Sequence, residues 1–78
     1  MMQAHVEIRL YASLKPKSPE NADRFPISPG MTVGEIIRIL GVSDAEAKLI
    51  FINGVKGTPD SILNGGERIA IFPPVGGG

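Results

Sequence analysis

The sequence closes on Glu67-Arg68-Ile69-Ala70-Ile71-Phe72-Pro73-Pro74-Val75-Gly76-Gly77-Gly78. The first half of this stretch alternates as a strand does, with Ile69 and Ile71 on one face and Phe72 on the other. Two prolines then fix the backbone and remove two amide donors, so strand pairing must stop there. The residues after Phe72 reach about 20 Å when fully extended, and the glycines carry no side chains. The stretch therefore predicts a strand that turns abruptly into a thin tail.

Composition limits the classes of function. The 78 residues predict one domain, over 1–72, with a flexible tail over 73–78. There is no cysteine, and eight basic residues balance eight acidic ones, so we expect no metal site and no nucleic-acid partner. The unbroken aliphatic and aromatic runs, such as 49–52, are too short to span a membrane, and the first residues do not resemble a signal peptide. We therefore expect a cytoplasmic protein that is monomeric when free.

The N-terminal half predicts two strands and a helix. Residues 5–11 alternate strictly, with Val6, Ile8 and Leu10 on one face, and 25–27 form a second strand that Pro26 confines to an edge. Between them, the polar segment 13–24 predicts a loop.

A capping box starts the helix. Thr32 and Glu35 occupy its two positions, apolar residues recur at helical spacing over 33–40, and Gly41 stands where a helix ends. The segment 43–46 repeats the capping pattern and predicts one further turn.

The C-terminal half predicts the rest of a sheet. Residues 48–52 form a third strand, Asn53-Gly54 is a hairpin turn, and Val55 begins a short return strand. We expect 60–63 to form a single helical turn and 64–66 a tight turn. One helix with one apolar stripe then lies across one face of a mixed α+β sheet of four to five strands.

The opposite face of that sheet is expected to be exposed. It would carry Tyr11 and Phe72, together with Phe51 or Ile50, among charged residues. Aromatic side chains beside a tail suggest a docking surface, which Arg9 and Arg68 would flank. The single histidine, His5, is expected to be an ordinary surface residue of the first strand.

The chain resembles the MoaD/ThiS sulfur-carrier proteins, which share the ubiquitin-like β-grasp fold. The segments that carry the resemblance are Ile8-Arg9-Leu10-Tyr11-Ala12-Ser13-Leu14, Gly30-Met31-Thr32-Val33-Gly34-Glu35-Ile36-Ile37, Phe51-Ile52-Asn53-Gly54-Val55 and 63–78. The chain departs from the family pattern at Gly66, where an aspartate is usual, and at Gly76, where another small residue is common. The segment between the helix and the third strand is also shorter than in typical molybdopterin-synthase small subunits.

The resemblance implies a carrier rather than an enzyme. The Gly78 carboxylate would be adenylated by an ATP-using, E1-like adenylyltransferase of the MoaB/MoeB/ThiF type and converted by a sulfur donor protein to a thiocarboxylate. Partners would recognise the tail through Pro73, Pro74, Val75, Gly76 and Gly77. The sulfur would pass to a large acceptor subunit, such as the catalytic subunit of molybdopterin synthase, and no cofactor would be bound by the carrier.

Three alternatives share the same sequence features. The carrier could serve thiamine or another thiolation pathway. The chain could instead be a ubiquitin-like modifier that is conjugated to lysines through Gly78. It could also be a β-grasp interaction module in which the tail has no role.

Overall fold

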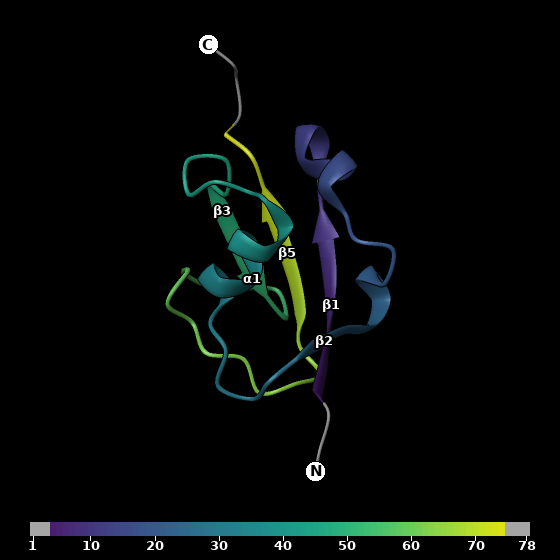
Figure 1. The fold of residues 1–78 in the computed structure, drawn as a ribbon. Coiled ribbons are helices and arrows are strands. Elements are labelled where there is room, and N and C mark those ends of the chain that lie inside the picture. The colour runs from purple at the N-terminus through teal and green to yellow at the C-terminus, as the bar shows by residue number, and fades with distance from the viewer. Residues whose placement is uncertain (1–3, 75–78) are drawn as a thin grey trace.

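Five strands form one mixed sheet in the computed structural model, which describes residues 4–74 (Figure 1). The strands are β1 (Ala4–Leu10), β2 (Phe25–Ile27), β3 (Leu49–Ile52), β4 (Val55–Lys56) and β5 (Arg68–Phe72). Their order across the sheet is β2-β1-β5-β3-β4. β1 and β5 are parallel, and the other neighbouring pairs are antiparallel. The predicted α+β class and mixed sheet are confirmed.

The two central strands bury the faces that their alternation predicts. Val6, Ile8 and Leu10 of β1 are buried, and Ile69 and Ile71 of β5 are completely buried. Because β5 lies between β1 and β3, the last strand of the chain is the best embedded one. The tail therefore starts from the centre of the sheet rather than from its edge.

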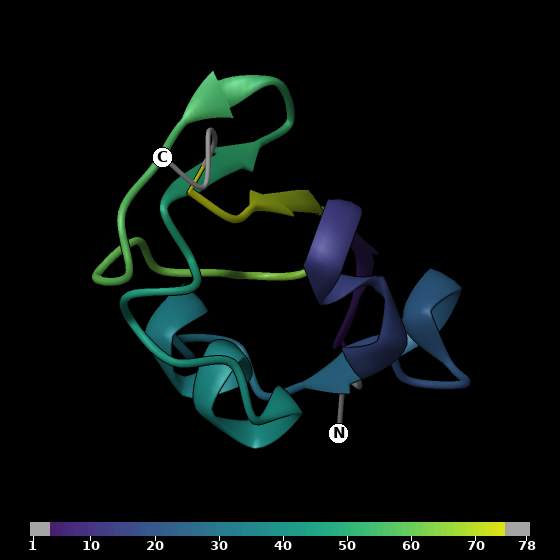
Figure 2. The ribbon, with the colours of Figure 1, turned by 90° about the horizontal axis from the view of Figure 1, so that it is seen from above.

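The single α-helix, α1 (Val33–Leu40), begins and ends where the sequence predicts. The Thr32 hydroxyl accepts the Glu35 N–H at 3.2 Å, and the Glu35 carboxylate accepts the Thr32 N–H at 3.0 Å. Gly41 ends the helix with φ of 78°, a conformation that favours glycine. Val33, Ile36 and Ile37 face the sheet, and Figure 2 shows the helix covering one side of it.

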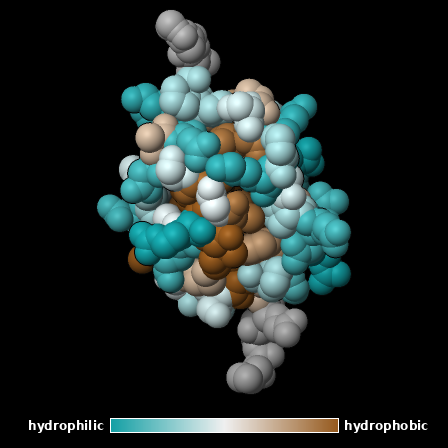
Figure 3. Space-filling view, turned by 45° about the horizontal axis from the view of Figure 1, so that its top comes forward, coloured by the Kyte–Doolittle hydropathy of each residue, from teal (hydrophilic) through white to brown (hydrophobic). Residues whose placement is uncertain are grey.

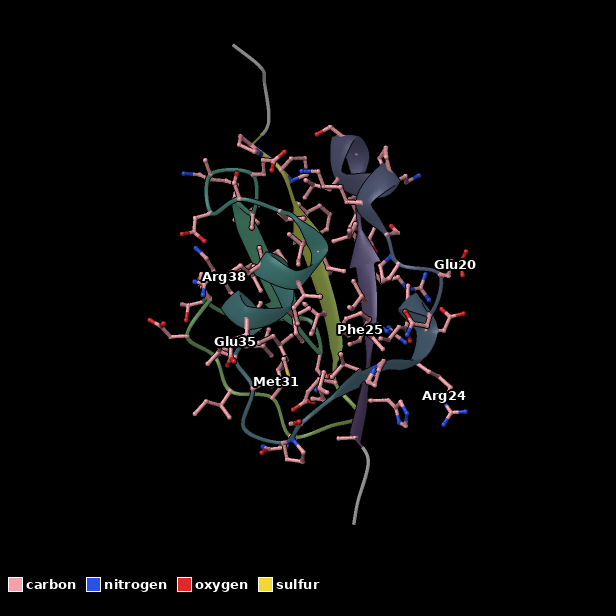
Figure 4. All side chains as sticks on the ribbon, in the orientation of Figure 1. Glu20, Arg24, Phe25, Met31, Glu35 and Arg38 are labelled. Carbon is pink, nitrogen blue, oxygen red and sulfur yellow. The ribbon has the colours of Figure 1, made fainter. Side chains whose placement is uncertain are left out.

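The core between helix and sheet contains no aromatic side chain among residues 4–74. Its buried residues are Val6, Ile8, Leu10, Leu14, Ile27, Val33, Ile36, Ile37, Val42, Ala47, Ile50, Leu63, Ile69 and Ile71. Phe25, Met31 and Leu40 pack against this core and stay partly exposed. Figure 3, which views the helix side, shows apolar surface in the middle of polar margins, and Figure 4 shows Phe25 pointing toward the helix.

Two turns adopt the predicted conformations. Asn53 and Gly54 both have positive φ, 53° and 82°, as a two-residue hairpin turn requires. In the segment 43–46, the Ser43 hydroxyl accepts the Glu46 N–H, and the Ser43 N–H donates to the Glu46 carboxylate. This second capping box closes a single hydrogen-bonded turn, as predicted.

Two predictions of local structure are wrong. The expected loop 13–24 contains two 3₁₀-helices, η1 (Ala12–Lys17) and η2 (Ala22–Arg24), and η1 buries Leu14 in the core. The expected helical turn 60–63 does not form: Asp60 lies in a hydrogen-bonded turn over 58–61, and the chain then pairs with another segment. Ile62 forms an antiparallel bridge with Thr32, and the Leu63 N–H donates to the Met31 carbonyl at 2.8 Å. Pairing with the segment before α1 thus replaces local helical hydrogen bonds.

Candidate functional site

The root of the tail is held from both sides. The Tyr11 N–H of the β1 side donates to the Ile71 carbonyl at 3.2 Å, and the Lys48 N–H of the β3 side donates to the Phe72 carbonyl at 3.0 Å. Pro73 and Pro74 follow at once and lie outside the strand. The direction in which the chain leaves the sheet is therefore fixed up to Phe72.

The tail residues Val75, Gly76, Gly77 and Gly78 lie outside the residues that the structure describes. Chemistry at the Gly78 carboxylate and recognition of residues 75–77 stay predictions.

An aromatic cluster lies where β5 ends and the tail begins. The rings of Tyr11 and Phe72 stack with centroids 4.4 Å apart and planes 7° apart. Phe51 meets Phe72 edge to face, with centroids 5.8 Å apart. Such pairs add about 0.5–1.5 kcal/mol beyond the area that they bury. The predicted proximity of Tyr11 and Phe72 is confirmed, and of the two further candidates Phe51 joins them whereas Ile50 is buried in the core.

These rings belong to one side of the sheet, which we call the sheet face. It is the side opposite α1, and strand register places on it His5, Glu7, Arg9, Tyr11, Pro26, Leu49, Phe51, Lys56, Arg68, Ala70 and Phe72. Three of the four aromatic residues of the chain therefore lie on the sheet face, and Tyr11 is 37% exposed. Aromatic side chains usually fill cores, so this placement on the side opposite α1 is unusual.

Arg9 and Arg68 share a single carboxylate on the sheet face. Arg9 forms an ion pair with Glu7, and the Arg68 Nε lies 3.4 Å from a Glu7 carboxylate oxygen. The Arg9 hydrogen bond, with a smaller contribution from Arg68, holds the pKa of Glu7 below its ordinary value. The structure thus brings the two predicted arginines together on the sheet face, with Arg9 two residues before Tyr11 and Arg68 toward the other end of the face. Sequence reasoning missed Glu7 as the group that joins them.

The opposite end of the sheet face is polar. His5 is half-buried there and lines a cavity of about 540 Å³ together with Glu7, Asp23, Asn53 and Arg68. Residues 4–74 contain no group of three or more histidine, cysteine, aspartate or glutamate side chains that could hold a metal ion. The described part of the chain offers no such cluster for catalysis by a metal.

Glu67 fixes the turn before β5. Its carboxylate accepts the Asn64 N–H at 2.8 Å and the Gly65 N–H at 2.7 Å. Burial raises the pKa of the Glu67 carboxyl, but these backbone hydrogen bonds outweigh burial and leave the pKa lowered. A glutamate three residues after Asn64, across two glycines, is the signal that could have predicted this contact.

Lys17 joins segments that are distant in sequence. Its ammonium donates to the Gly41 carbonyl at 2.8 Å and to the Glu46 carboxylate at 3.1 Å. These two contacts of Lys17 connect η1 to the end of α1 and to the turn that follows it. No local pattern could have predicted them, because the partners are 24 and 29 residues away.

No helix within residues 4–74 is long and apolar enough to cross a membrane.

Comparison with known proteins places the chain among ubiquitin-like domains. No curated protein matches the chain. The fold is similar to the solution structure of the HVO 2177 protein from Haloferax volcanii, with 22% identity, a TM-score of 0.71, and coverage of 97% of this chain and 88% of that one. It is also similar to the crystal structure of SAMP1 from Haloferax volcanii, with 22% identity, a TM-score of 0.67, and coverage of 96% and 100%.

These likenesses establish a ubiquitin-like β-grasp fold. They confirm, at the level of fold, the resemblance to the MoaD/ThiS carriers. The family model for the Mut7-C ubiquitin domain matches residues 1–76, and the chain belongs to that ubiquitin-like family.

Proposed function

We propose that the protein is a sulfur carrier that works through the carboxylate of Gly78. The observation that supports this most directly is the Tyr11–Phe72 stack, which puts an exposed aromatic cluster where β5 ends and the tail begins. A partner that docks on this cluster has the start of the tail beside it. A domain with no such role gains little from keeping its aromatic side chains on the solvent side.

The proposed chemistry needs only a carboxylate from this chain. A Gly78 oxygen attacks the α-phosphorus of ATP in the partner, and pyrophosphate leaves. A sulfur donor at the oxidation level of sulfide then attacks the acyl-adenylate, which releases AMP and a proton and leaves a thiocarboxylate. The activating enzyme supplies the catalytic groups, and the carrier supplies the carbonyl and the docking surface.

Within this class, we propose the small subunit of molybdopterin synthase, which donates sulfur to a pterin precursor for a molybdenum or tungsten cofactor. The support is the resemblance of Tyr11-Ala12-Ser13-Leu14 and of the Phe72-Pro73-Pro74-Val75 ending. The acceptor would be the large catalytic subunit, and the reaction would take place in the cytoplasm. A carrier for thiamine or another thiolation pathway would use the same face and tail.

A second candidate is a ubiquitin-like modifier, which the match to a family described as ubiquitin favours. Its Gly78 would be adenylated in the same way and then joined to lysine side chains. The two candidates differ only in the nucleophile that attacks the adenylate.

Intact-mass spectrometry separates the candidates. The protein is produced together with the E1-like enzyme and the sulfur donor of its own organism, and a preparation without the E1-like enzyme is the control. Replacement of one oxygen by sulfur at the C-terminus, absent from the control, is expected for a carrier. A ladder of conjugates on other proteins would identify a modifier. An unchanged mass with active enzyme and ATP would contradict both, and the same measurement establishes whether Gly78 is the mature end.

A further inference from the structure

Only the first half of β1 has a strand on its outer side. β2 pairs with residues 4–6 of β1, and this pairing begins at Phe25. The chain before Phe25 does not continue the strand, because it forms η2, in which the Arg24 N–H donates to the Asn21 carbonyl at 3.0 Å. Within residues 4–74, the second half of β1 therefore has β5 on one side and no strand on the other.

The backbone groups that face this open side belong to Ile8 and Leu10. The Glu7 and Tyr11 N–H groups donate to carbonyls on the β5 side, at 2.9 and 3.2 Å. Successive residues of a strand direct their backbone groups to opposite sides, so those of Ile8 and Leu10 point outward. In the part of the chain that the structure describes, these outward N–H and C=O groups form no hydrogen bond.

A hollow of about 520 Å³ lies beside these unpaired groups. It is bounded by β1 and by the chain from η1 to η2, which bows away from the strand (Figure 1), and we call it the edge groove. Ile8 and Leu10 line the edge groove and are only 3% and 6% exposed. Backbone groups of residues this buried are nearly always paired. The edge groove therefore presents donors and acceptors, in the spacing of a strand edge, to whatever occupies it.

Charge is unevenly distributed along the edge groove. Lys15 lines it at the end where β1 leads into η1, and Asp23 lines it at the end where η2 leads into β2. Arg9 lies between them, on the sheet face beside Glu7. Lys15 forms no ion pair among residues 4–74, so its charge is available to a ligand. Along the direction of β1, the charges of the groove thus run from Asp23 through Arg9 to Lys15.

A second copy of the chain is a poor occupant of this edge. Two β1 strands that pair antiparallel through Ile8 and Leu10 place their Arg9 side chains directly opposite each other. Like charges in that position are destabilising, whereas a carboxylate opposite Arg9 is stabilising. The edge therefore favours a strand of different sequence over self-association.

We propose that the edge groove binds an extended segment of a partner protein, which pairs antiparallel with Ile8 and Leu10 and carries an acidic residue opposite Arg9. Such a segment runs from the Lys15 end to the Asp23 end, so a second acidic residue is favoured before the central one and a basic residue after it. The residues between these charges lie opposite Leu10 and Ile8 and are small and apolar, since they share the α1 side of the sheet. Recognition is by strand addition, with backbone hydrogen bonds giving affinity and side chains giving specificity.

The test is backbone amide hydrogen exchange, measured by NMR, with the pentapeptide Asp-Val-Asp-Val-Lys blocked at both ends. At saturation the peptide is expected to slow exchange of the Ile8 and Leu10 amides at least about tenfold, because both become hydrogen-bonded. The Arg9 amide already faces β5 and should change by less than about twofold.

N-methylated peptides of the same charge are the matched controls for strand pairing. In the proposed register the valine N–H groups face β1 and the N–H of the central aspartate faces away. Methylation of both valine nitrogens is therefore expected to weaken binding at least about tenfold, and methylation of the central aspartate nitrogen by less than about threefold.

Two charge variants test the contribution of Lys15. Lys15→Glu is expected to weaken binding of the unmodified peptide at least about threefold at low salt. Arg38→Glu changes the net charge equally but lies on α1, away from the edge groove (Figure 4), and should leave the affinity within about 1.5-fold. The exchange rates of the buried β5 amides verify that each variant is folded.

Three results would overturn the proposal. Unchanged exchange of the Ile8 and Leu10 amides at millimolar peptide would mean that the groove holds only water. Protection of these amides that rises with protein concentration, without peptide, would assign the edge to a second copy. Binding that survives methylation of the valine nitrogens would show recognition without strand pairing. None of these measurements involves Gly78, so their outcome is independent of the proposed sulfur chemistry.

Discussion

At the scale of the residue, Phe72 has the sharpest assignment. It ends β5, stacks on Tyr11, and lies on the opposite side of the strand from the fully buried Ile71. The sequence predicted this from alternation alone, because a strand with one buried face leaves only two parities. The sequence alone leaves the Phe51 contact open, since residues on both faces of β3 are apolar and only the register with β5 decides between them.

Phe72→Lys is expected to weaken binding to the activating enzyme at least about tenfold while the domain stays folded. The lost stack and apolar contact should lower the free energy of unfolding by about 1–2 kcal/mol. Urea unfolding and isothermal titration calorimetry measure the two effects. Ile71→Lys is the control on the buried parity and should prevent folding. Loss of the fold in Phe72→Lys would show that this side chain supports the core.

At the scale of the element, prediction succeeded where the signals were local and failed where tertiary contacts decided. The helix and the hairpin carry their start and stop residues in adjacent positions, such as Thr32 with Glu35 and Asn53 with Gly54. In η1, one apolar residue, Leu14, gives no periodicity to detect, and its burial depends on the remote sheet. Likewise, pairing with Thr32 makes the segment around Ile62 extended, and only the folded chain brings these residues together.

The turn before β5 is an element whose stability should depend on pH. Because the pKa of Glu67 is lowered in the folded protein, its contribution is fully present above the ordinary carboxyl value of 4.5 and is lost as the pH falls through the folded value. Glu67→Gln is expected to cost about 1 kcal/mol at pH 7, as loss of a cap does, and to flatten the decline of stability below about pH 5. Urea unfolding from pH 7 to pH 2 measures both.

Glu7 and Glu46 also have lowered pKa values and remain in this variant, so part of the acid-dependent loss should persist. If the free energies of unfolding of the unchanged protein and of Glu67→Gln fall in parallel throughout this pH range, the Glu67 carboxylate does not stabilise the turn.

At the scale of the whole molecule, we expect the domain and the tail to have separable roles. The buried residues lie between Val6 and Ile71, and the Tyr11–Phe72 stack and the hydrogen bonds at Ile71 and Phe72 complete the domain. Composition indicated this division, because every apolar segment precedes the two prolines. The pairing of Arg9 and Arg68 with Glu7 could not be predicted in the same way, since it depends on which strands become neighbours.

Deleting Gly77 and Gly78 is therefore expected to change the melting temperature by no more than about 1 °C, because the buried core is formed by residues between Val6 and Ile71. The same deletion should abolish sulfur transfer while association with the activating enzyme through the sheet face persists, weakened only by the lost tail contacts. Differential scanning calorimetry, intact-mass spectrometry and stopped-flow association measure these three quantities on one preparation. Phe72→Lys should instead keep the Gly78 carboxylate and lose association with the activating enzyme. A truncated protein that unfolds would make the tail part of the domain, and one that still acquires sulfur would move the reactive group away from Gly78.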